Sequence, residues 1–557
     1  MPGSILGNAV VRVEDPELLV GAGAFVGDLP ADGLLHAAFV RSSVAHGRVL
    51  SVDVSDARTQ PGVVGAFTAA DLELPAFHGL AVLNADCARP PLATDKVRFV
   101  GEPVAVVVAD SAAAAVDAAE AVVVDIEPLP AVVDPEAALA DGAPLQFEEL
   151  GTNLAAGLGA RADDALAGAD VVVRGRLENQ RIAVAPLECD AVAVHPATDG
   201  TVTAYVSTQM PHLWRDTVTR LFELDPGQLR VITPHVGGAF GGKAGASAEH
   251  LVVVAVARRL GRPVRWVQSR SENLVAMHGR GQVQYGELGL RRDGTITGLR
   301  CRIAADAGAY AGFGGALALG PTRSMAQGPY RIPTISYAAA AAMTNTAPVG
   351  AFRGAGRPEA TALLERLVDL AAFELDIDPV ELRRRNLLGA DQFPFRTAMG
   401  TTYDCGDYQA ALDEVVRLAG YDELRRDQAE RRSRGDHVQL GIGVSTYVEV
   451  TAGGGGSEFG AVEVHTDGTA TIRVGTSGHG QGHATSFSMI VADRLGIPME
   501  AIRFVQSDTA VVPRGGGTGG SRSLQIGGNA VGAAADAVLV QARELAAAHL
   551  EAAPADI

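Results

Sequence analysis

The first part of the chain consists of short hydrophobic stretches separated by turns. Residues 34–41 have the composition of a β-strand, and residues 96–109 have that of two strands joined by a Gly-Glu-Pro turn. An alanine-rich helix is expected at 112–121, followed by a strand through Val124. The pattern therefore predicts a small α+β unit over residues 1–135.

The second part of the chain alternates strand and helix patterns. It follows residues 136–170, which we interpret as a linker because the stretch 151–170 is rich in Gly, Ala and Asp. Strands are expected at 171–177, 191–195 and 201–206, and helices at 249–260, 359–373 and 380–388. These elements predict a lobe over residues 171–405.

The last part, residues 406–557, is expected to form another lobe. A polar, charged helix is expected at 421–434, strands near 439–449 and a helix at 529–550, with glycine-rich loops between them. The chain as a whole is therefore expected to be an α+β multidomain protein.

Composition and charge narrow the classes of protein. A chain with 47% hydrophobic and 20% charged residues is an ordinary globular protein, which excludes a disordered or fibrous one. The 46 Lys and Arg residues against 65 Asp and Glu residues give a net charge of −19. Such a surface repels nucleic acid and anionic membranes, so neither is expected as a partner.

The cysteines point to a reducing compartment. The four cysteines are Cys87, Cys189, Cys301 and Cys405, and no Cys-x-x-Cys pair exists. This spacing disfavours a zinc ribbon, a thioredoxin site and a protein-ligated iron–sulfur cluster. The sequence shows no secretory signal and no apolar run long enough to span a bilayer, so a cytoplasmic location is expected.

The first candidate ligand-binding loop runs from Gly237 to Lys243, between a strand and a helix. Backbone N–H groups in such a loop form an anion cradle, and the spacing satisfies G-x-x-x-x-G-K. The next residue is Ala244, where a nucleotide-hydrolysing P-loop needs Ser or Thr to hold magnesium. A cofactor cradle, a P-loop and a turn used only for close packing all remain open.

Two further loops lie in the last lobe. In the loop 475–483, His479 and His483 have the spacing of a helical zinc pair, but the glycines between them disfavour a helix. Gln481 is better suited to donating an amide hydrogen bond to a bulky ligand. The loop 515–523 combines backbone donors and hydroxyls with Arg522, which suits either a phosphate site or a flexible turn.

A fourth loop, residues 344–359, carries Arg353 between small residues, where its guanidinium could reach a buried anionic or oxo group. A surface salt bridge is the alternative for any single arginine. Several separate glycine-rich loops with Gln, Arg and Ser together suggest one large polyanionic cofactor held from many sides.

Taken in order, VSTQMP, VGGAFGGK, TNTAPVGAFRGAGRPEA, GTSGHGQGH and GTGGSRS make the sequence resemble a known family. The chain resembles the molybdenum-cofactor-binding subunit of the xanthine dehydrogenase/aldehyde oxidase family, with the organisation of the carbon monoxide dehydrogenase large subunit. The resemblance implies an N-terminal α/β hammerhead domain (1–135) and two mixed α/β molybdopterin-binding lobes (171–405 and 406–557), the second incomplete.

The resemblance also implies roles for individual residues. Gln209 is expected beside the oxo or sulfido ligand of the metal, Phe240 and Gly241 at the metal and the pterin, and Arg353 on the dithiolene side. The metal itself is held by the dithiolene sulfurs of the cofactor, so no protein metal ligand is expected. The other expected cofactor contacts are Gly238, Gly480, Gln481, Gly520, Ser521 and Ser523.

The implied activity is hydroxylation of an aldehyde or N-heteroaromatic carbon, with water as the oxygen source. The cofactor is molybdopterin, as such or as its cytosine dinucleotide. Electrons are expected to pass to a small subunit with [2Fe-2S] clusters and a medium subunit with FAD, in a heterotrimer or a dimer of heterotrimers.

Three departures bear on the substrate. Carbon monoxide enzymes place a copper-binding cysteine where this chain has Gly354, which disfavours carbon monoxide. Xanthine enzymes carry Phe at the position of Ala355 and Glu at that of Ala244, which disfavours xanthine. Ala244 and Ala355 are therefore expected in a substrate pocket of a different kind.

The general base of the family, a glutamate in a Gly-x-Gly-Glu-type motif, has no match in this sequence. The resemblance places it beyond Ile557, the last residue, while Glu102 belongs to a different motif of the N-terminal unit. We therefore expect a truncated subunit that contains no catalytic base and is inactive on its own. Two other hypotheses are a non-catalytic decoy or assembly protein derived from the family, and a nucleotide-binding protein that uses the near-P-loop.

Overall fold

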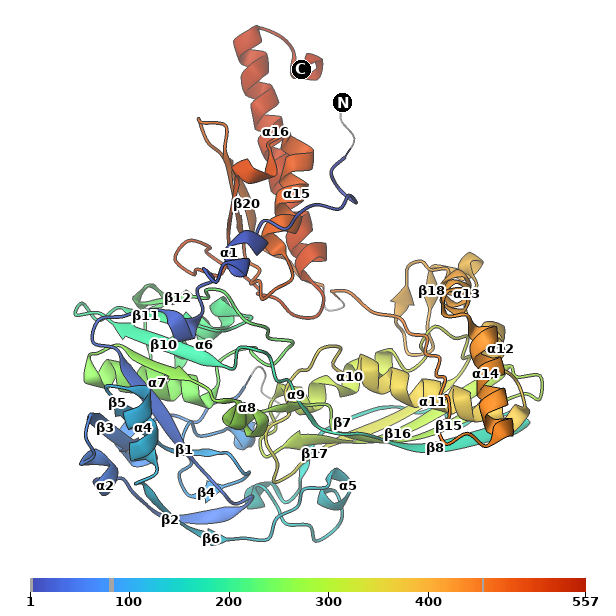
Figure 1. Ribbon diagram of the computed structural model, residues 1–557, viewed down its shortest axis with the longest axis horizontal. Coiled ribbons are helices and arrows are strands. Elements are labelled where there is room, and N and C mark those ends of the chain that lie inside the picture. The colour runs from blue at the N-terminus through green and yellow to red at the C-terminus, as the bar shows by residue number, and fades with distance from the viewer. Residues whose placement is uncertain (1–3, 80–84, 453–454) are drawn as a thin grey trace.

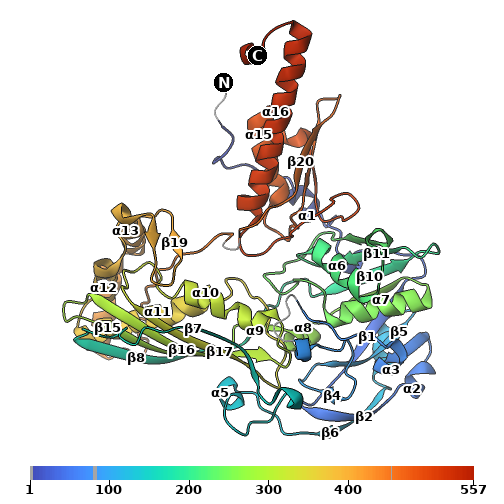
Figure 2. The ribbon, with the colours of Figure 1, turned by 180° about the vertical axis from the view of Figure 1, so that it is seen from behind.

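The computed structural model describes residues 4–79, 85–452 and 455–557. A broad base carries the N-terminal unit, the first lobe and a helical arm, and a narrower lobe of C-terminal residues stands on it (Figure 1, Figure 2). The N-terminal residues, with α1 (Asp15–Leu19), run along the foot of this standing lobe (Figure 1). The arrangement confirms the α+β multidomain fold that the sequence predicts.

A seven-stranded mixed sheet forms one half of the base. Its strands, in spatial order, are β12 (Leu229–Ile232), β11 (Val202–Val206), β10 (Ala191–Pro196), β13 (Val264–Val267), β1 (Leu35–Arg41), β5 (Pro103–Ala109) and β3 (Val63–Thr68). β1 pairs in parallel with β13, with Leu35 beside Val264. The N-terminal unit and the first lobe therefore share one sheet. Such a pair between distant segments leaves no local pattern, so the sequence could not predict it.

The packing of this sheet explains its sequence. β5 is buried along its whole length between β1 and β3, which accounts for its unbroken hydrophobic run. The helices α4 (Ala112–Ala119), α6 (Pro211–Leu221) and α7 (Ala248–Leu260) pack on the sheet. α7 begins after Ser247, whose Oγ accepts a hydrogen bond from the backbone of His250. The core therefore fixes both ends of the loop that joins β12 to α7.

A five-stranded sheet forms the other half of the base. Its strands, in spatial order, are β7 (Leu154–Ala160), β17 (Ile335–Met343), β16 (Ile296–Gly308), β15 (Gln282–Leu290) and β8 (Val171–Asn179). The long helix α11 (Arg357–Leu375) packs on β8 and β15. β7 lies within the stretch predicted as a linker. Its Gly and Ala residues pair with the alanines of β17, with Gly157 beside Ala340, so their small size marks close packing here.

The standing lobe has a small core of its own. The strands β20 (Gly460–Val464), β21 (Ala470–Val474) and β22 (Ile502–Val505) form its sheet, on which α15 (His483–Leu495) and α16 (Asn529–Leu550) pack. Residues 439–449, predicted as strands, form none. Side chains satisfy part of their backbone instead: Gln428 donates to the carbonyl of Leu440, and Glu365 accepts from the N–H of Thr446.

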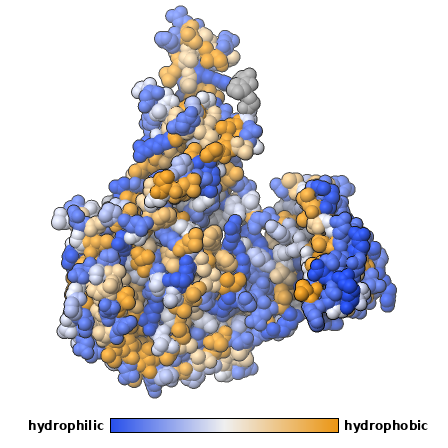
Figure 3. All heavy atoms as spheres, in the orientation of Figure 1, coloured by the Kyte–Doolittle hydropathy of each residue, from blue (hydrophilic) through white to orange (hydrophobic). Residues whose placement is uncertain are grey.

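The remaining elements are short. The arm carries α12 (Pro379–Asn386), α13 (Tyr408–Ala419) and α14 (Tyr421–Arg434), and its face in Figure 3 is mostly hydrophilic. The other strands are β2 (Gly47–Asp53), β4 (Lys96–Val97), β6 (Val123–Pro128), β9 (Ile182–Ala183), β14 (His278–Gly279), β18 (Phe395–Arg396) and β19 (Thr402–Tyr403). The other α-helices are α2 (Ser55–Arg58), α3 (Ala69–Leu72), α5 (Pro135–Ala138), α8 (Arg270–Ala276), α9 (Phe313–Leu317) and α10 (Leu319–Ser324).

None of the helices in the part of the chain that the structure describes has the length and apolar character needed to cross a membrane.

A buried arginine ties the arm to the segment that leads into the standing lobe. Arg383 is fully buried, and its guanidinium donates to Glu365, to Asp369 at 2.9 Å and to the carbonyl of Val444 at 2.8 Å. Removing one partner of a buried ion pair costs about 3–5 kcal/mol because the other charge is left unpaired. We predict a loss of this size in the free energy of unfolding of Arg383→Leu, measured by urea denaturation.

The neighbouring Arg384 is the matched control, because its pair with Asp413 is exposed. Arg384→Leu should leave the denaturation midpoint nearly unchanged. An equal loss in both variants would contradict the structural role of Arg383.

Candidate functional site

A cavity of about 2780 Å³, here called the groove, lies between the standing lobe and the base. Four glycine-rich loops from distant parts of the sequence line it. All twelve residues that the sequence analysis selected are among its lining residues: Gln209, Gly238, Phe240, Gly241, Ala244, Arg353, Ala355, Gly480, Gln481, Gly520, Ser521 and Ser523. Their roles toward a cofactor remain predictions, but the structure brings their positions together.

The loop 237–243 has positive φ angles, which few residues other than glycine adopt readily. Gly241 has a φ of +102°, and a Cβ on it would lie 2.6 Å from the carbonyl oxygen of Ala351. Phe240 also has a positive φ, at +51°, and its ring stays partly exposed. The loop thus turns sharply, presses against the arginine loop and leaves the Phe240 ring at the groove.

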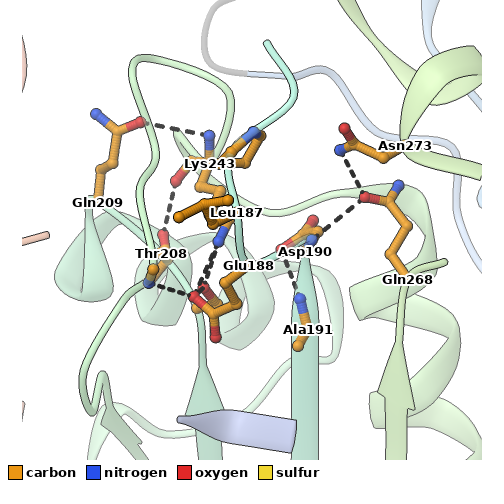
Figure 4. Close-up of polar contacts among 12 residues, drawn as sticks. Leu187, Glu188, Asp190, Ala191, Thr208, Gln209, Lys243, Gln268 and Asn273 are labelled. Atoms are coloured by element: carbon orange, nitrogen blue, oxygen red, sulfur yellow. Dashed lines mark hydrogen bonds and ion pairs between the residues drawn. The ribbon is translucent and has the colours of Figure 1, made fainter. Parts of the chain in front are cut away.

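A buried ion pair holds this loop from behind (Figure 4). The Nζ atom of Lys243 lies 3.0 Å from Oε2 of Glu188 and 2.9 Å from Oγ of Ser207. The same carboxylate oxygen accepts the backbone N–H of Gly237 at 2.7 Å. The Lys243 side chain is only 2% exposed, so it cannot reach a phosphate. The P-loop alternative is therefore not supported.

The amide of Gln209 joins three segments. Its Oε1 atom accepts the backbone N–H groups of Gly241 at 2.9 Å and Lys243 at 3.3 Å. Its Nε2 atom donates to the carbonyl of Thr518, in the loop of the standing lobe, at 2.9 Å. Gln209 is buried, and it aligns the two lobes across one end of the groove.

The arginine loop is fixed by another buried carboxylate. Glu359 accepts from the backbone N–H of Gly356 at 2.8 Å and from Arg280 at 3.0 Å, while Arg280 also donates to the carbonyl of Arg353. The Arg353 backbone N–H donates to the carbonyl of Phe240. Within the residues that the structure describes, the Arg353 side chain has no hydrogen bond or ion pair, and its guanidinium lies 5.9 Å from the Phe240 ring centroid.

In the standing lobe, Glu458 plays the equivalent part for the loop 515–523. It is buried and accepts the backbone N–H of Gly516 at 3.0 Å. The backbone N–H groups of Gly519, Gly520 and Ser521 donate no hydrogen bond to any described residue. These N–H groups and the open space at Gly520 form an anion cradle that faces the groove.

The loop 475–483 is not a zinc site. His479 donates its backbone N–H to Gln481, whose Nε2 atom lies 2.9 Å from the His479 ring, while the His483 ring contacts Gln506. No group of His, Cys, Asp and Glu side chains among the described residues has the arrangement of a metal site. Burial, together with the nearby His483, lowers the pKa of His479 to about 4.

The N-terminal segment 12–18, which sequence reasoning missed, also lines the groove. Glu14 accepts from both the hydroxyl and the backbone N–H of Thr485, near the start of α15, and the N–H of Val13 donates to the same hydroxyl. Arg12 lies over Gly482. A segment without a glycine motif or helical period gives no sequence signal for such a position.

A second cavity, here called the chamber, has a volume of about 190 Å³. It is lined by Phe77 and Arg89 of the N-terminal unit and by the loops of the first lobe. The chamber and the groove share one wall, formed by Pro186, Gly241, Ala244 and Ala351. Ala244 thus faces both cavities, whereas Ala355, also predicted for the substrate pocket, faces only the groove.

Neither cavity is lined by a residue that the resemblance identifies as the catalytic base. Ile557, beyond which the resemblance places the glutamate, is exposed and lines neither the groove nor the chamber. Glu102, the other glutamate in a similar motif, is buried in the N-terminal unit and accepts from the backbone N–H of Arg98 and from the hydroxyl of Tyr310. It also lines neither cavity. The position of the base beyond Ile557 therefore stays a prediction.

Comparisons with known families cover most of the chain. Residues 147–387 and 414–557 each match a family model described as a molybdopterin cofactor-binding domain. Residues 20–130 match the a/b hammerhead domain of aldehyde oxidase and xanthine dehydrogenase. The first match begins before β7, so the predicted linker overlaps the first cofactor-binding domain.

Individual relatives match nearly the whole chain. The carbon monoxide dehydrogenase large chain of Hydrogenophaga pseudoflava is 36% identical over 575 residues, which cover 97% of this chain and 71% of that protein. The nicotine 6-hydroxylase large subunit of Paenarthrobacter nicotinovorans is 35% identical, with 100% and 70% covered. The solved structure of quinoline 2-oxidoreductase from Pseudomonas putida 86 superposes with a TM-score of 0.93 at 34% identity, covering 99% of this chain and 72% of that one.

The Glu188–Lys243 pair yields the first prediction for the site. Glu188→Gln leaves the buried Lys243 charge without its partner, at a cost of about 3–5 kcal/mol. Hydrogen exchange of the Gly241 and Lys243 amides should accelerate by about a hundredfold or more, since 1.4 kcal/mol is tenfold. Glu178→Gln, at an exposed position on β8, should leave these rates unchanged. Unchanged exchange in Glu188→Gln would show that the pair does not hold the loop.

The lowered pKa of His479 yields a pH dependence. An unfolded histidine binds its proton near pH 6.5, whereas His479 stays neutral in the fold down to about pH 4. Its contribution to stability is therefore complete above pH 6.5 and is lost as the pH falls from 6.5 to 4. Hydrogen exchange of residues 478–483 should accelerate over this range in the wild type and much less in His479→Gln. The control His437→Gln, at an exposed site, should behave as the wild type does.

Proposed function

This chain belongs to the xanthine dehydrogenase and aldehyde oxidase family of molybdopterin-binding oxidoreductase subunits, and we propose that it oxidises a small aldehyde or N-heteroaromatic molecule with water as the oxygen source. The observation that carries the proposal is the convergence of twelve residues, from four glycine-rich loops and the separate segment that carries Gln209, on one groove. The chamber beside that groove offers a separate space for a small substrate.

The groove fits a cofactor that is anionic and brings its own metal ligands. Among the described residues, its walls offer backbone N–H groups without a partner at Gly520 and Ser521, and two arginines, Arg353 and Arg503, whose side chains make no hydrogen bond or ion pair. No protein metal site lies among the residues that the structure describes. When bound, the molybdenum cofactor supplies a two-electron redox centre whose metal is held by dithiolene sulfur.

The residues of this chain then have distinct tasks. Phe240 and Gly241 form the wall toward the metal, and Gln209 holds that wall in register with the standing lobe. The free guanidinium of Arg353 binds acceptor atoms of the cofactor. The loops at Gly480 and Ser521 bind the anionic part through backbone N–H groups.

The dimensions of the groove favour the dinucleotide form of the cofactor. Its volume of about 2780 Å³ is well above the roughly 300–1000 Å³ of pockets for drug-sized ligands. It also extends past the loop 475–483 to Arg12 and Arg503, where a second phosphate and a nucleoside would lie. We therefore assign the cytosine dinucleotide form, rather than the mononucleotide, to this groove.

The residues at the shared wall position the substrate but supply no base. Among the described residues, the carboxylates that line the chamber are Asp190 and Glu249. Burial would raise the pKa of Glu249, but Arg41 and Arg89 lower it to about 2. Asp190 accepts from Ala191 and His250. We infer that the general base comes from a residue outside this set, in keeping with the expected glutamate beyond Ile557.

After the substrate is oxidised, its electrons must leave the chain, and we expect this chain to pass them to other subunits. Several relatives are named as a large chain or a large subunit, which indicates enzymes of several chains. We propose a [2Fe-2S] subunit and an FAD subunit as partners, in a heterotrimer or a dimer of heterotrimers.

The test is metal and nucleotide analysis of the protein purified with its partner subunits. We expect molybdenum close to one atom per chain and release of cytidine monophosphate on acid treatment. Arg353→Ala should lower the molybdenum content about tenfold or more, because hydrogen bonds to a charged group contribute about 1.5–3 kcal/mol. Arg292→Ala, at an exposed turn, is the control. Zinc alone, or no metal, in the wild type would refute the proposal.

A further inference from the structure

The chamber has walls suited to a small, flat, apolar molecule. Phe77 comes from the N-terminal unit, and Val184, Ala246, Met277 and Val349 come from the first lobe. At about 190 Å³, the chamber is smaller than the roughly 300 Å³ at which pockets for drug-sized ligands begin. A molecule of one or two fused rings is therefore the size class that fits.

Most charged side chains at the chamber already have partners. Lys243 is paired with Glu188, and Glu249 lies 2.8 Å from Arg41. The uncharged amides are also engaged in part, since Asn273 donates to Gln268, which accepts from the backbone of Asp190 (Figure 4). These contacts leave few groups that could recognise a ligand.

Arg89 is the exception. Among the described residues its side chain makes no direct hydrogen bond or ion pair, and its Nε atom is buried without a partner. The guanidinium lies 5.3 Å from the ring centroid of Phe99 and 5.8 Å from that of Tyr310. Rings that hold the faces of a guanidinium leave the N–H donors at its edge free. The protein thus presents at the chamber an oriented donor set that no described residue uses.

The surrounding charges decide which acceptor suits these donors. Arg41 contacts both Glu249 and Glu272, and Arg89 is near enough to Glu249 to lower the pKa of that carboxyl together with Arg41, against the effect of burial. Arg89 and Arg98 likewise oppose the rise that burial causes in the pKa of Glu102, so three guanidinium groups face three carboxylates. A ligand carboxylate would add an uncompensated negative charge in a small apolar space, whereas a neutral acceptor would not.

We propose that Arg89, on the N-terminal unit, determines substrate specificity by donating hydrogen bonds to a neutral acceptor, a ring nitrogen or a carbonyl oxygen, of a small aromatic molecule in the chamber. The inference rests on the proposed function, because the chamber opens toward the wall where the cofactor metal is expected. It adds a recognition residue from outside both cofactor-binding domains, and it selects neutral over anionic substrates.

Equilibrium dialysis of the full assembled protein with three probes of similar shape tests this assignment. The probes are quinoline, which has a ring nitrogen, naphthalene, which has no acceptor, and quinoline-4-carboxylate, which adds a charge. The wild type should bind quinoline most tightly of the three. Arg89→Gln should weaken quinoline binding by about ten- to a hundredfold, as expected for hydrogen bonds from a charged donor, and leave naphthalene binding unchanged.

Arg48→Gln is the matched control, because Arg48 lies in the same unit and pairs with Glu127 at an exposed site. It should bind all probes as the wild type does. Equal quinoline binding by the wild type and Arg89→Gln would overturn the assignment, as would tighter binding of the carboxylate or no binding of any probe. Parallel loss of quinoline and naphthalene in Arg89→Gln would reduce Arg89 to a structural role and also overturn it.

The same samples separate this inference from the proposed function. Protein without molybdenum that still shows Arg89-dependent quinoline binding would refute the proposed function and leave the recognition role of Arg89 standing. Protein with a full complement of molybdenum but binding independent of Arg89 would do the reverse.

Discussion

The buried pair of Lys243 and Glu188 is the contact on which the groove depends. Glycine-rich loops have no strand partners and few side chains, so their backbone N–H groups need other acceptors. Glu188 serves the loop at Gly237, Glu359 serves the arginine loop, and Glu458 serves the loop at Gly516. In each case the carboxylate holds the loop from the side away from the groove, which none of the three glutamates lines. Charge-assisted bonds to backbone N–H groups are among the stronger hydrogen bonds, which suits loops without other support.

This arrangement determines which groups remain for a ligand. Charged side chains behind the loops neutralise one another, as Lys243 and Glu188 or Arg280 and Glu359 do. The groups in front of the loops have no partner among the described residues: the backbone N–H groups near Gly520 and the guanidinium of Arg353. Whether a charged group already has a partner therefore indicates its role, supporting a loop or binding a ligand, more clearly than its residue type does. Lys243 stands at the position of a phosphate-binding lysine in the sequence, but it is buried and supports the loop instead.

Sequence reasoning succeeded where the signal was local. Helices such as α7 and α11 follow from their hydrophobic pattern, and the comparisons confirm the family resemblance that the loop motifs carry, while the roles of the individual loop residues stay predictions. Sequence reasoning failed where the structure of a segment depends on a partner that is distant in the chain. β7 has the composition of a linker because its small residues face the alanines of β17, and β1 gives no sign that it joins β13. The segment 439–449 has a strand-like pattern, yet side chains of the arm take the place of a neighbouring strand.

The shared wall of the two cavities suggests why recognition lies on the N-terminal unit. At Ala244 this chain has a methyl group where xanthine-oxidising relatives are expected to carry a glutamate, so the wall itself offers a substrate neither charge nor bulk. A wall without polar side chains gives little orientation, and orientation must then come from the opposite side of the chamber. Arg89 also lines the chamber, and it belongs to the N-terminal unit, whose strands continue the sheet of the first lobe through β1 and β13. That shared sheet joins the unit that carries Arg89 to the first lobe, as the proposed role of a donor outside both cofactor-binding domains requires.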